Sequence, residues 1–423
     1  MAREKKVEHY DVVIIGGGAA GLTSAIYAGR ARLNTLLIEK ALVGGLATYT
    51  NEIANYPGFP GEPKGEEITN LMKEQAKNMG VKFKLTDVKS VQLEGHEKVV
   101  ETFRNKFIAK TVILATGGRP RTTGALNEEN FLFDKGISFC ATCDAASNTG
   151  KHVVVIGSGD AAIEEGMFLT KFADKVTVSV MHDEGKMDCN EIARNQALKN
   201  PKMNFVWNTV ADSFEGDTHL ERVVMKNLKT GEKIPVDCDN CFEFIGYIPN
   251  TEIFQGQIQL TDRGYILTND KMETNIPGVF SCGDVREKWL KQVATAVGDG
   301  AIAGFAAEKY IAETEAYDQL IESTEEKPGL VYLYNAIDAP SREFLNTIER
   351  YENEKSGDVA VSRIDVYKSK GLADRFGVEK FPAAVAVKNG EILCVCYDEL
   401  CKDGFCTTLF DNMIENSVVA SKA

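Results

Sequence analysis

The same pattern of apolar strand, glycine-rich turn, helix and second strand occurs twice in this sequence. The first copy is YDVVIIGGGAAGLTSAIYAGRARLNTLLIEK, from Tyr10, and the second is KHVVVIGSGDAAIEEGMFLTKFADKVTVSV, from Lys151. An uninterrupted apolar run such as Val12 to Ile15 is typical of a strand that is covered on both faces, as in parallel sheets. A glycine turn between such a strand and a helix predicts a dinucleotide-binding unit. The repeat therefore indicates an α/β fold with two Rossmann-like dinucleotide-binding domains.

Glycines and an acid follow the first strand at the spacings that a dinucleotide requires. Gly16, Gly18 and Gly21 supply the tight turn, the close approach to the ligand and the close helix packing. The helix N-terminus behind them offers unpaired N–H groups to a pyrophosphate. Glu39 ends the second strand at the distance expected for an acid that bonds a ribose hydroxyl. The corresponding loop of the second unit contains Gly157, Gly159 and Ala162, which predicts a second dinucleotide site.

A dithiol motif stands directly before the second unit. Cys140 and Cys143 form a C-x-x-C that is followed by Asp144. In disulfide exchange a thiolate attacks a disulfide, a second thiol resolves the product and a carboxyl group handles protons. Two alternatives remain open: half of a zinc site completed by Cys238 and Cys241, or a pair of inert core cysteines. The flanking acid favours a redox-active pair.

Charge and hydropathy exclude several classes of partner. The net charge of −14 argues against nucleic acid and against an anionic membrane surface. No apolar run approaches the roughly 18 residues of a membrane span, and the charged N-terminus leads straight into a strand. We therefore expect a cytoplasmic protein, in which cysteines are reactive, metal-binding or inert rather than cross-linked. The five histidines show no ligand spacing, so no metal is assigned.

Five segments together resemble low-molecular-weight thioredoxin reductases. They are GGLATYTNEIANYPG, FCATCDA, GSGDAAIEEG, FIGYIPNT and GVFSCGDV, in the order and nearly the spacing of that family, between residue 8 and about residue 316. The resemblance implies two Rossmann-like domains of the three-layer ββα type. Residues 1–120 and 248–317 would form a discontinuous FAD-binding domain, and residues 121–247 an NAD(P)-binding-like domain that carries the redox C-x-x-C. It also implies a homodimer that reduces thioredoxin or another small disulfide protein.

The resemblance also assigns roles to single residues. Cys143 would face the flavin, Cys140 would attack the substrate disulfide, and Asp144 would serve as acid and base. Rotation of one domain would offer the disulfide and the nicotinamide to the flavin in turn. Asp284, between a strand and a long helix, would bond the ribityl chain of FAD. The other expected FAD contacts are Gly45, Leu46, Asn55, Thr116, Gly117, Gln292 and Val293. The family usually has Gln where this chain has Leu46, which bears on one hydrogen bond to FAD.

The resemblance fails where the family binds the 2′-phosphate of NADPH. The family has a His-Arg-Arg run there and another arginine four residues on, which bind the phosphate by charge-assisted bonds. This chain reads Val-Met-His-Asp-Glu-Gly-Lys over 180–186, so that Asp183 and Glu184 would repel a phosphate. Three donors stay open: NADH if Asp183 bonds the ribose diol, reduced ferredoxin acting on the flavin directly, and, in last place, NADPH held by Lys186.

The C-terminal quarter is expected to form a separate domain. The acidic stretch 318–329 contains Pro and Gly and is interpreted as a linker. The strand and helix order of 330–423, and FGVEKFPAAVAVKNGE within it, resemble thioredoxin, with Pro382 at the cis-proline position. Asp-Ala-Pro-Ser stands at 338–341 in place of the two catalytic cysteines, so this site cannot exchange dithiols. Cys394, Cys396, Cys401 and Cys406 are interpreted as core or surface residues, with a relay or regulatory disulfide as the alternative.

The sequence thus supports three functions. The first is a flavin-dependent disulfide reductase that passes electrons through FAD and the Cys140–Cys143 pair. The second is an FAD-dependent dithiol oxidase, which would use oxygen as acceptor and need no nicotinamide site. The third is a non-enzymatic redox sensor or assembly subunit, which an inactive thioredoxin-like domain would suit.

Overall fold

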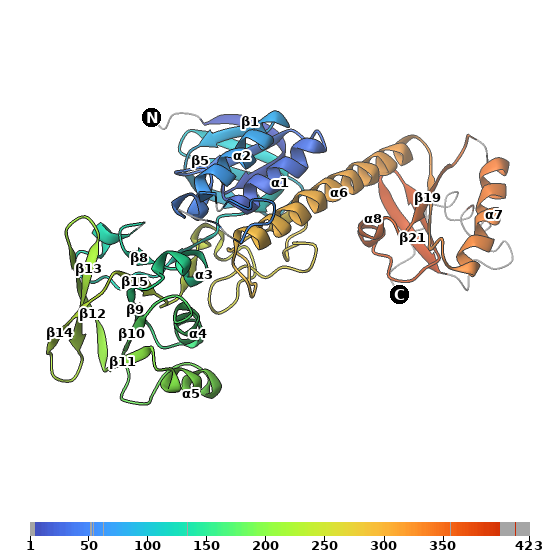
Figure 1. The fold of residues 1–423 in the computed structure, drawn as a ribbon. Helices are drawn as coiled ribbons and strands as arrows, with labels where there is room; N and C mark the ends of the chain where they lie inside the picture. The colour runs from blue at the N-terminus through green and yellow to red at the C-terminus, as the bar shows by residue number, and fades with distance from the viewer. Residues whose placement is uncertain are drawn as a thin grey trace. The chain divides into compact units, whose positions relative to one another are not determined.

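The structure is a computed structural model that describes residues 5–50, 53, 55–61, 63–132, 134–355, 357–397 and 411. The chain divides into two compact units, Met1–Ala307 and Glu308–Ala423, and one helix, α6 (Val293–Glu326), has residues in both (Figure 1). None of the helices within the described ranges is long and apolar enough to cross a membrane.

The first sheet of the N-terminal unit has the strand order β3-β2-β1-β6-β5-β4. Its strands are β1 (Lys6–Ile15), β2 (Thr35–Glu39), β3 (Lys82–Leu85), β4 (Val88–Gln92), β5 (Lys98–Thr102), β6 (Asn105–Leu114) and β17 (Val279–Ser281). Strand β17 pairs in parallel with the end of β6, so the sheet draws on segments far apart in the sequence. The helices of this part are α1 (Ala19–Arg30), α2 (Gly65–Asn78) and the 3₁₀ helix η1 (Gly45–Tyr49).

Helices α1 and α6 pack closely because glycines face the contact. A Cβ atom at Gly300 would lie 2.3 Å from the carbonyl oxygen of Ala20, and one at Gly304 would lie 2.7 Å from Cβ of Tyr27. The sheet itself encloses an apolar cluster that includes Val13, Phe107 and residues of the return segment such as Phe254. This packing fixes the start of α6 and the loop before it beside the first glycine turn.

The second sheet is wholly parallel, with the order β11-β10-β9-β15-β8. Its strands are β8 (Ile137–Ser138), β9 (His152–Ile156), β10 (Lys175–Val180), β11 (Met203–Trp207) and β15 (Asn240–Glu243). One face packs on the helices α3 (Ala141–Asp144), α4 (Asp160–Leu169) and α5 (Glu191–Lys199), with η3 (Ala146–Asn148) after α3. The other face packs on an antiparallel sheet of β12 (Thr209–Gly216), β13 (Leu220–Asn227) and β14 (Lys233–Asp237). This arrangement is the expected ββα layering.

Two short strands connect the first sheet with the second. Strand β7 (Gly118–Pro120) leads out of the first sheet, and β16 (Tyr247–Pro249) leads back from the second (Figure 1). They pair antiparallel, Tyr247 opposite Pro120. The 3₁₀ helices η2 (Glu128–Phe131) and η4 (Glu252–Phe254) follow them in the chain. The chain therefore crosses between the sheets along one narrow two-stranded ribbon.

The C-terminal unit is built on a four-stranded mixed sheet with the order β19-β18-β20-β21. Its elements are β18 (Gly329–Tyr334), α7 (Ala339–Glu354), β19 (Ala360–Asp365), α8 (Lys370–Arg375), β20 (Ala383–Lys388) and β21 (Glu391–Tyr397). The Phe381–Pro382 peptide bond is cis, as expected for Pro382. The β20–β21 turn is at Asn389 and Gly390, both with positive φ, as an Asn-Gly hairpin turn requires.

The interpretation of 318–329 as a linker is wrong for most of its length. Helix α6 continues to Glu326, and only the residues around Pro328 and Gly329 leave it. Leu320 and Ile321 pack against the apolar cluster of the C-terminal sheet. The helix therefore forms part of the C-terminal unit, whose first residue is Glu308 rather than a residue near 330.

Candidate active site

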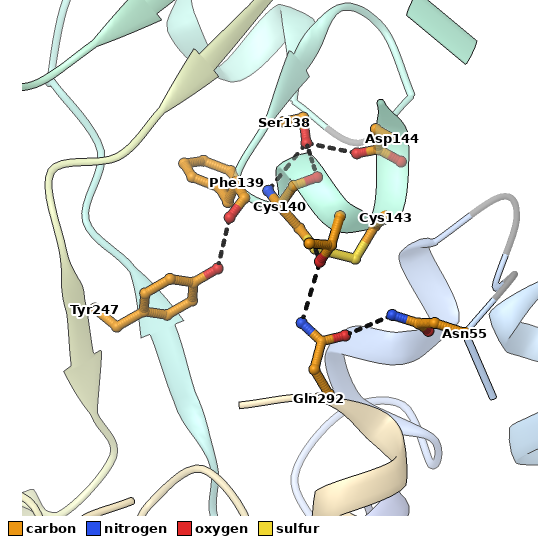
Figure 2. The surroundings of a disulfide bond; sticks show 9 residues. Asn55, Ser138, Phe139, Cys140, Cys143, Asp144, Tyr247 and Gln292 are labelled. Atoms are coloured by element: carbon orange, nitrogen blue, oxygen red, sulfur yellow. Dashed lines mark hydrogen bonds between the residues drawn. A yellow bond between two sulfur atoms is a disulfide. The ribbon is translucent and has the colours of Figure 1, made fainter. Parts of the chain in front are cut away.

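Cys140 and Cys143 are joined by a disulfide at the start of α3 (Figure 2). The Ser138 hydroxyl accepts the backbone N–H of Cys140 at 3.1 Å and donates to the Asp144 carboxylate at 2.5 Å. Asp144 lies one turn beyond Cys140, and its N–H donates to the Cys140 carbonyl. Ser138 therefore holds both the backbone of Cys140 and the predicted acid, Asp144. The sequence analysis missed Ser138, although its place beside the motif was a signal.

Two of the predicted cofactor contacts lie beside this disulfide. The Asn55 amide donates to Oε1 of Gln292 at 3.0 Å, and Nε2 of Gln292 donates to the Thr142 hydroxyl at 3.4 Å (Figure 2). Asn55 comes from the loop after η1, and Gln292 directly precedes Val293, the first residue of α6. The loop, the start of α6 and the dithiol motif thus meet at one place.

The first glycine turn forms a cradle that side chains would fill. Gly16 has a φ of +108°, and a Cβ there would lie 2.2 Å from the Ala115 carbonyl oxygen. A Cβ at Gly21 would lie 2.0 Å from the Gly16 carbonyl, so the helix can approach the turn only with glycine here. At Gly18, the N-cap of α1, nothing lies within 4 Å of a Cβ position. The loop therefore leaves open space at the helix N-terminus, as a pyrophosphate needs.

Glu39 and the loop that follows complete the cradle. The Glu39 carboxylate accepts the N–H of Gly17 at 2.8 Å and that of Ala41 at 2.9 Å, which fixes it at the end of β2. A Cβ at Gly45 would lie 3.0 Å from Cα of Gly18, so this loop passes directly over the turn. Leu46 follows and is exposed.

Thr116 and Gly117 are held by a residue that the sequence analysis did not single out. The Thr116 hydroxyl donates to the Asn250 carbonyl at 2.7 Å, and the Asn250 amide donates to the Thr116 carbonyl at 2.8 Å. The Asn250 N–H also bonds the Gly117 carbonyl. Asn250 lies within the motif FIGYIPNT, which was its only signal in the sequence. It anchors the returning chain against the small-residue turn.

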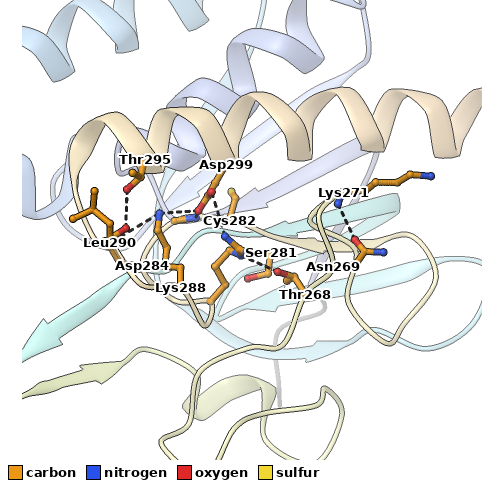
Figure 3. Close-up of polar contacts among 12 residues, drawn as sticks. Thr268, Asn269, Lys271, Ser281, Cys282, Asp284, Lys288, Leu290, Thr295 and Asp299 are labelled. Carbon is orange, nitrogen blue, oxygen red and sulfur yellow. Dashed lines mark hydrogen bonds and ion pairs between the residues drawn. The ribbon is translucent and has the colours of Figure 1, made fainter. Parts of the chain in front are cut away.

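Asp284 carries a carboxylate oxygen that lacks a hydrogen-bond donor among the described residues (Figure 3). This Oδ1 atom is buried, and the Lys288 ammonium stands 4.0 Å away. Burial raises the pKa of Asp284, while Lys288 opposes that rise. A buried acceptor without a donor is costly, and a ligand hydroxyl placed here would satisfy it.

Asp299, which the sequence analysis also missed, holds the Asp284 loop in place (Figure 3). Its carboxylate accepts the N–H of Gly283 at 3.1 Å and pairs with Lys288 at 2.9 Å and Arg286 at 3.3 Å. All three side chains are largely buried. The signal was an acid inside the apolar stretch of α6. The open glycine cradle, Glu39 and the donor-less oxygen of Asp284 together fit a flavin dinucleotide with hydroxyls along its chain.

The second glycine loop is covered by the segment that follows β10. The Ser158 hydroxyl and the His182 ring both bond Oδ2 of Asp188, at 3.1 and 2.8 Å, and the Asp188 N–H donates to the Ser158 carbonyl at 3.0 Å. Asn190 donates twice to Asp160, the first residue of α4. Gly157, Gly159 and Ala162 keep the expected turn, with Gly157 at a φ of +129°. The loop therefore keeps the turn of a dinucleotide site. The segment that follows β10 and covers it contains Asp183, Glu184 and Asp188, and is called its acidic rim.

The zinc alternative for the dithiol is wrong. Cys140 is bonded to Cys143, and Cys238 and Cys241 are buried in a separate apolar cluster. Burial raises the pKa of Cys238 to about 12 and that of Cys241 well above its ordinary value, so both stay neutral thiols. Within the described residues no group of three or more His, Cys, Asp or Glu side chains could hold a metal ion.

A buried pair of carboxyl groups lies where the connecting ribbon enters the second sheet. Glu128 accepts the N–H groups of Thr123 and Gly124 at 2.8 and 2.6 Å, and Glu243 ends β15 beside it. Both side chains are almost fully buried. Burial, and next the neighbouring Glu128, raise the pKa of Glu243 from 4.5 to about 9. Glu243 is therefore protonated at neutral pH.

We expect Glu243→Gln to reduce the loss of stability at alkaline pH. The folded state binds the Glu243 proton more tightly than the unfolded chain, so this contribution is complete below pH 4.5 and is lost as the pH rises through about 9. Gln has nearly the same shape but cannot ionise, so the variant lacks this pH-dependent contribution. Melting temperatures measured from about pH 5 to pH 9 should fall less steeply in the variant, with exposed Glu232→Gln as control. Parallel curves for variant and parent would contradict this assignment.

Comparison with known proteins identifies the family. The profile described as pyridine nucleotide-disulphide oxidoreductase matches residues 10–300. The chain is 44% identical over 308 residues to the thioredoxin reductase of Peptoclostridium acidaminophilum, which covers 71% of this chain and 97% of that protein. It is 40% identical over 314 residues to the thioredoxin reductase of Bacillus subtilis strain 168, with 74% and 97% covered.

Solved structures agree with the sequence relatives. Thioredoxin reductase from Streptococcus pyogenes MGAS5005 is similar with a TM-score of 0.67 and 37% identity, over 72% of this chain and 98% of that one. Thioredoxin reductase from Lactococcus lactis, in a structure described as the FR conformation, gives a TM-score of 0.53 and 39% identity, over 72% and 99%. The chain therefore belongs to the pyridine nucleotide-disulphide oxidoreductase family, as a thioredoxin reductase-like, flavin-dependent disulfide reductase.

Proposed function

We propose that the substrate is thioredoxin or another small disulfide protein, and that Cys140 and Cys143 carry out the exchange. The observation that carries this proposal is the Cys140–Cys143 disulfide, placed against the segments of Asn55 and Gln292. The relatives named thioredoxin reductase support the same substrate class.

The residues have the roles in cofactor binding and disulfide exchange that the resemblance implies. FAD, when bound, supplies a two-electron redox couple; Glu39, Asp284 and the first glycine cradle would hold it. The Cys140 thiolate attacks the substrate disulfide, and Cys143, the sulfur expected to face the flavin, resolves the mixed disulfide and restores the Cys140–Cys143 bond. Asp144, oriented by Ser138, gives a proton to the departing substrate sulfur.

The donor that fits this site best is not NADPH. The position four residues after the family's arginine pair is Asp188, so all three basic positions are acidic here. Asp183 is paired with Lys229, which leaves Asp188 as the acid that contacts the glycine loop directly. A ribose diol can donate to a carboxylate, whereas a 2′-phosphate is repelled by it. We therefore favour NADH, with reduced ferredoxin as the second candidate donor.

An anaerobic titration of the full chain tests the function and the donor together. Reductants are added to the flavin-loaded protein, namely NADH, NADPH and reduced ferredoxin in separate runs, followed by a thioredoxin disulfide. A reductase is bleached by a donor and reoxidised by the thioredoxin. Bleaching by dithiols with recovery in air would favour the oxidase, and no turnover with any of these would favour the sensor.

The C-terminal unit is proposed to be a thioredoxin-like domain whose usual active site is silent. The strand order, the cis bond before Pro382 and helix α7 after β18 support this assignment. In place of a dithiol, the Asp338 carboxylate accepts the N–H and the hydroxyl of Ser341 at 3.1 and 2.8 Å. A relay disulfide remains the alternative: Sγ atoms of Cys394 and Cys396 are 4.0 Å apart, and Cys401 and Cys406 lie outside the described residues.

Replacing Asp338 by Ala should destabilise the C-terminal unit without affecting disulfide reduction. Asp338 is the N-cap of α7, and removal of such a cap costs about 1 kcal/mol. Denaturation of the variant should show a less stable C-terminal transition, while turnover of a thioredoxin disulfide stays at the parent rate. Asp338→Asn should recover most of the stability. A large fall in turnover would mean that the substituted motif takes part in the reaction.

The expected homodimer and cytoplasmic location remain proposals. Apolar side chains on the adjoining helices α1 and α6 support a dimer: Tyr27, Ile302 and Phe305 are 39, 42 and 51% exposed. Helix α6 packs against α1 at Gly304, so these residues lie close enough to form one apolar surface. Sedimentation of the full chain tests this proposal directly.

A further inference from the structure

Three polar side chains form a hydrogen-bonded series that ends on the sulfur of Cys140 (Figure 2). The Asn55 amide lies 3.0 Å from Oε1 of Gln292, Nε2 of Gln292 lies 3.4 Å from the Thr142 hydroxyl, and that hydroxyl lies 3.4 Å from Sγ of Cys140. The first two residues come from segments far from the dithiol in the sequence. Thr142 stands between the two cysteines of the motif.

The direction of each bond in this series follows from chemistry. A disulfide sulfur has no hydrogen, so the Thr142 hydroxyl must donate to Cys140 rather than accept from it. The hydroxyl can at the same time accept from the Gln292 amide. Asn55 donates to the amide oxygen of Gln292, which fixes the amide nitrogen toward Thr142. All donors therefore point along one path toward the sulfur.

We propose that Thr142 stabilises the Cys140 thiolate of the reduced enzyme, and that Gln292 and Asn55 act through Thr142 as positioning residues. The proposal rests on the proposed role of Cys140 as nucleophile. Two electrons from the donor break the Cys140–Cys143 bond and leave two thiolates, and one proton converts Cys143 to the thiol. The hydroxyl that faces a neutral sulfur in the disulfide then faces a negative one, where its hydrogen bond is stronger.

The titratable groups around the motif cannot supply this stabilisation. Asp144 on α3 is an acid bonded to Ser138, and Glu165 on α4 lies near the backbone N–H groups of Ala141 and Thr142. Burial raises the pKa of Glu165, which is the direction that limits its negative charge beside a thiolate. The Tyr247 hydroxyl on β16 donates to the Phe139 carbonyl at 3.0 Å. These neighbours are acids or already donate their proton elsewhere. The neutral donor series that ends at the Thr142 hydroxyl is therefore the group that favours the Cys140 thiolate.

Thr142→Val tests the proposal because it removes the hydroxyl and keeps the shape. The measured quantity is the rate at which Cys140 of the reduced, flavin-loaded full chain is alkylated, resolved by peptide mass spectrometry and followed against pH. We expect the pKa of Cys140 to rise by about one unit, which lowers the thiolate fraction about tenfold below that pKa. Thr142→Ser, which retains a hydroxyl, should restore the parent curve.

The pH profile separates this role from a structural one. A less stabilised thiolate is a better nucleophile, by roughly threefold per unit of pKa. The variant should therefore react about threefold more slowly than the parent at low pH, and about threefold faster above both pKa values. A misplaced Cys140 would be slower at every pH. An unchanged pKa, or slower alkylation throughout, would overturn the proposal.

A second variant tests the positioning residues. Asn55→Ala should shift the pKa of Cys140 in the same direction by a smaller amount, and should add nothing in the Thr142→Val background, because its effect passes through the hydroxyl. Flavin absorbance is recorded with each variant to detect cofactor loss. If the pKa shifts of the two substitutions add in the double variant, Asn55 does not act through Thr142 and the proposal is contradicted. Alkylation needs no substrate protein, so its outcome is independent of whether Cys140→Ser abolishes substrate turnover.

Discussion

Cys140→Ser and Cys143→Ser each abolish disulfide reduction, and both proteins remain yellow. Each variant removes one sulfur of the only disulfide found among the described residues, so no two-electron exchange with a substrate can be completed. The flavin cradle is made by other residues, from Gly16 to Asp284, and a Ser at position 140 or 143 leaves it intact. Turnover of a thioredoxin disulfide and the visible absorption spectrum measure the two expectations separately.

The two variants should differ in how they fail. With Cys143→Ser, the Cys140 thiolate can still attack, and the mixed disulfide persists because no second thiol resolves it. With Cys140→Ser, the proposed nucleophile is absent and no adduct accumulates. Non-reducing electrophoresis with a thioredoxin distinguishes the cases. Cys189→Ser, a change at a half-buried thiol outside the motif, is the matched control and keeps full activity. Full activity in either motif variant, or an adduct only on Cys143, would refute the assigned roles.

Short-range sequence patterns predicted the parts of the site that short-range physics determines. Gly16 and Gly21 are required by contacts within a few residues or with the adjoining strand, so the glycine spacing alone indicated the turn. The Cys140–Cys143 pair and the Asn389–Gly390 turn are local in the same sense. Each of these features depends on a chain conformation that a handful of consecutive residues fixes.

Apart from Ser138, the residues that were missed act across longer sequence distances. Asp299 holds the N–H of Gly283, and Asn250 holds Thr116, 134 residues away. The sequence gives only an indirect signal for each: an acid within an apolar stretch of α6 for Asp299, and the motif FIGYIPNT for Asn250. The Asn55–Gln292–Thr142 series is of the same kind, since it joins residues 237 and 150 positions apart.

The linker interpretation failed for a different reason. The acids of 318–326 suggested a solvated, irregular stretch, but a helix places residues three and four apart on one face. Tyr317, Leu320 and Ile321 have that spacing and pack against the C-terminal sheet, while the acids occupy other positions of the helix. The linker prediction relied on the acidic composition of this segment and overlooked the helical spacing of its apolar residues. Pro328 and Gly329 mark only the end of the helix.

The acidic rim of the second glycine loop leads to the other large expected effect: replacing Asp183, Glu184 and Asp188 together by Arg makes NADPH an effective donor. Each arginine removes a repulsive charge and offers charge-assisted bonds to a 2′-phosphate. One such bond is worth about 1.5 kcal/mol or more, hence about tenfold in affinity. Three replacements should raise affinity for NADPH on the order of 10³-fold. NADH affinity should fall, because Asp188 no longer faces the ribose diol.

Stopped-flow bleaching of the flavin by micromolar NADPH and NADH measures the change. The matched control replaces three other exposed acids, Glu94, Asp217 and Glu221, by Arg, which alters the net charge equally. Asp217 and Glu221 lie at the β12–β13 turn, at the opposite end of these strands from Thr209 and Asn227. If charge at the loop excludes NADPH, the flavin of the first triple variant should be reduced by NADPH and that of the control should not. A parent protein that NADPH already reduces faster than NADH would contradict the exclusion. A triple variant that NADPH still cannot reduce would mean that the covered loop, with Ser158 and Asp160 bonded to the segment after β10, excludes every dinucleotide, and reduced ferredoxin would then be the donor.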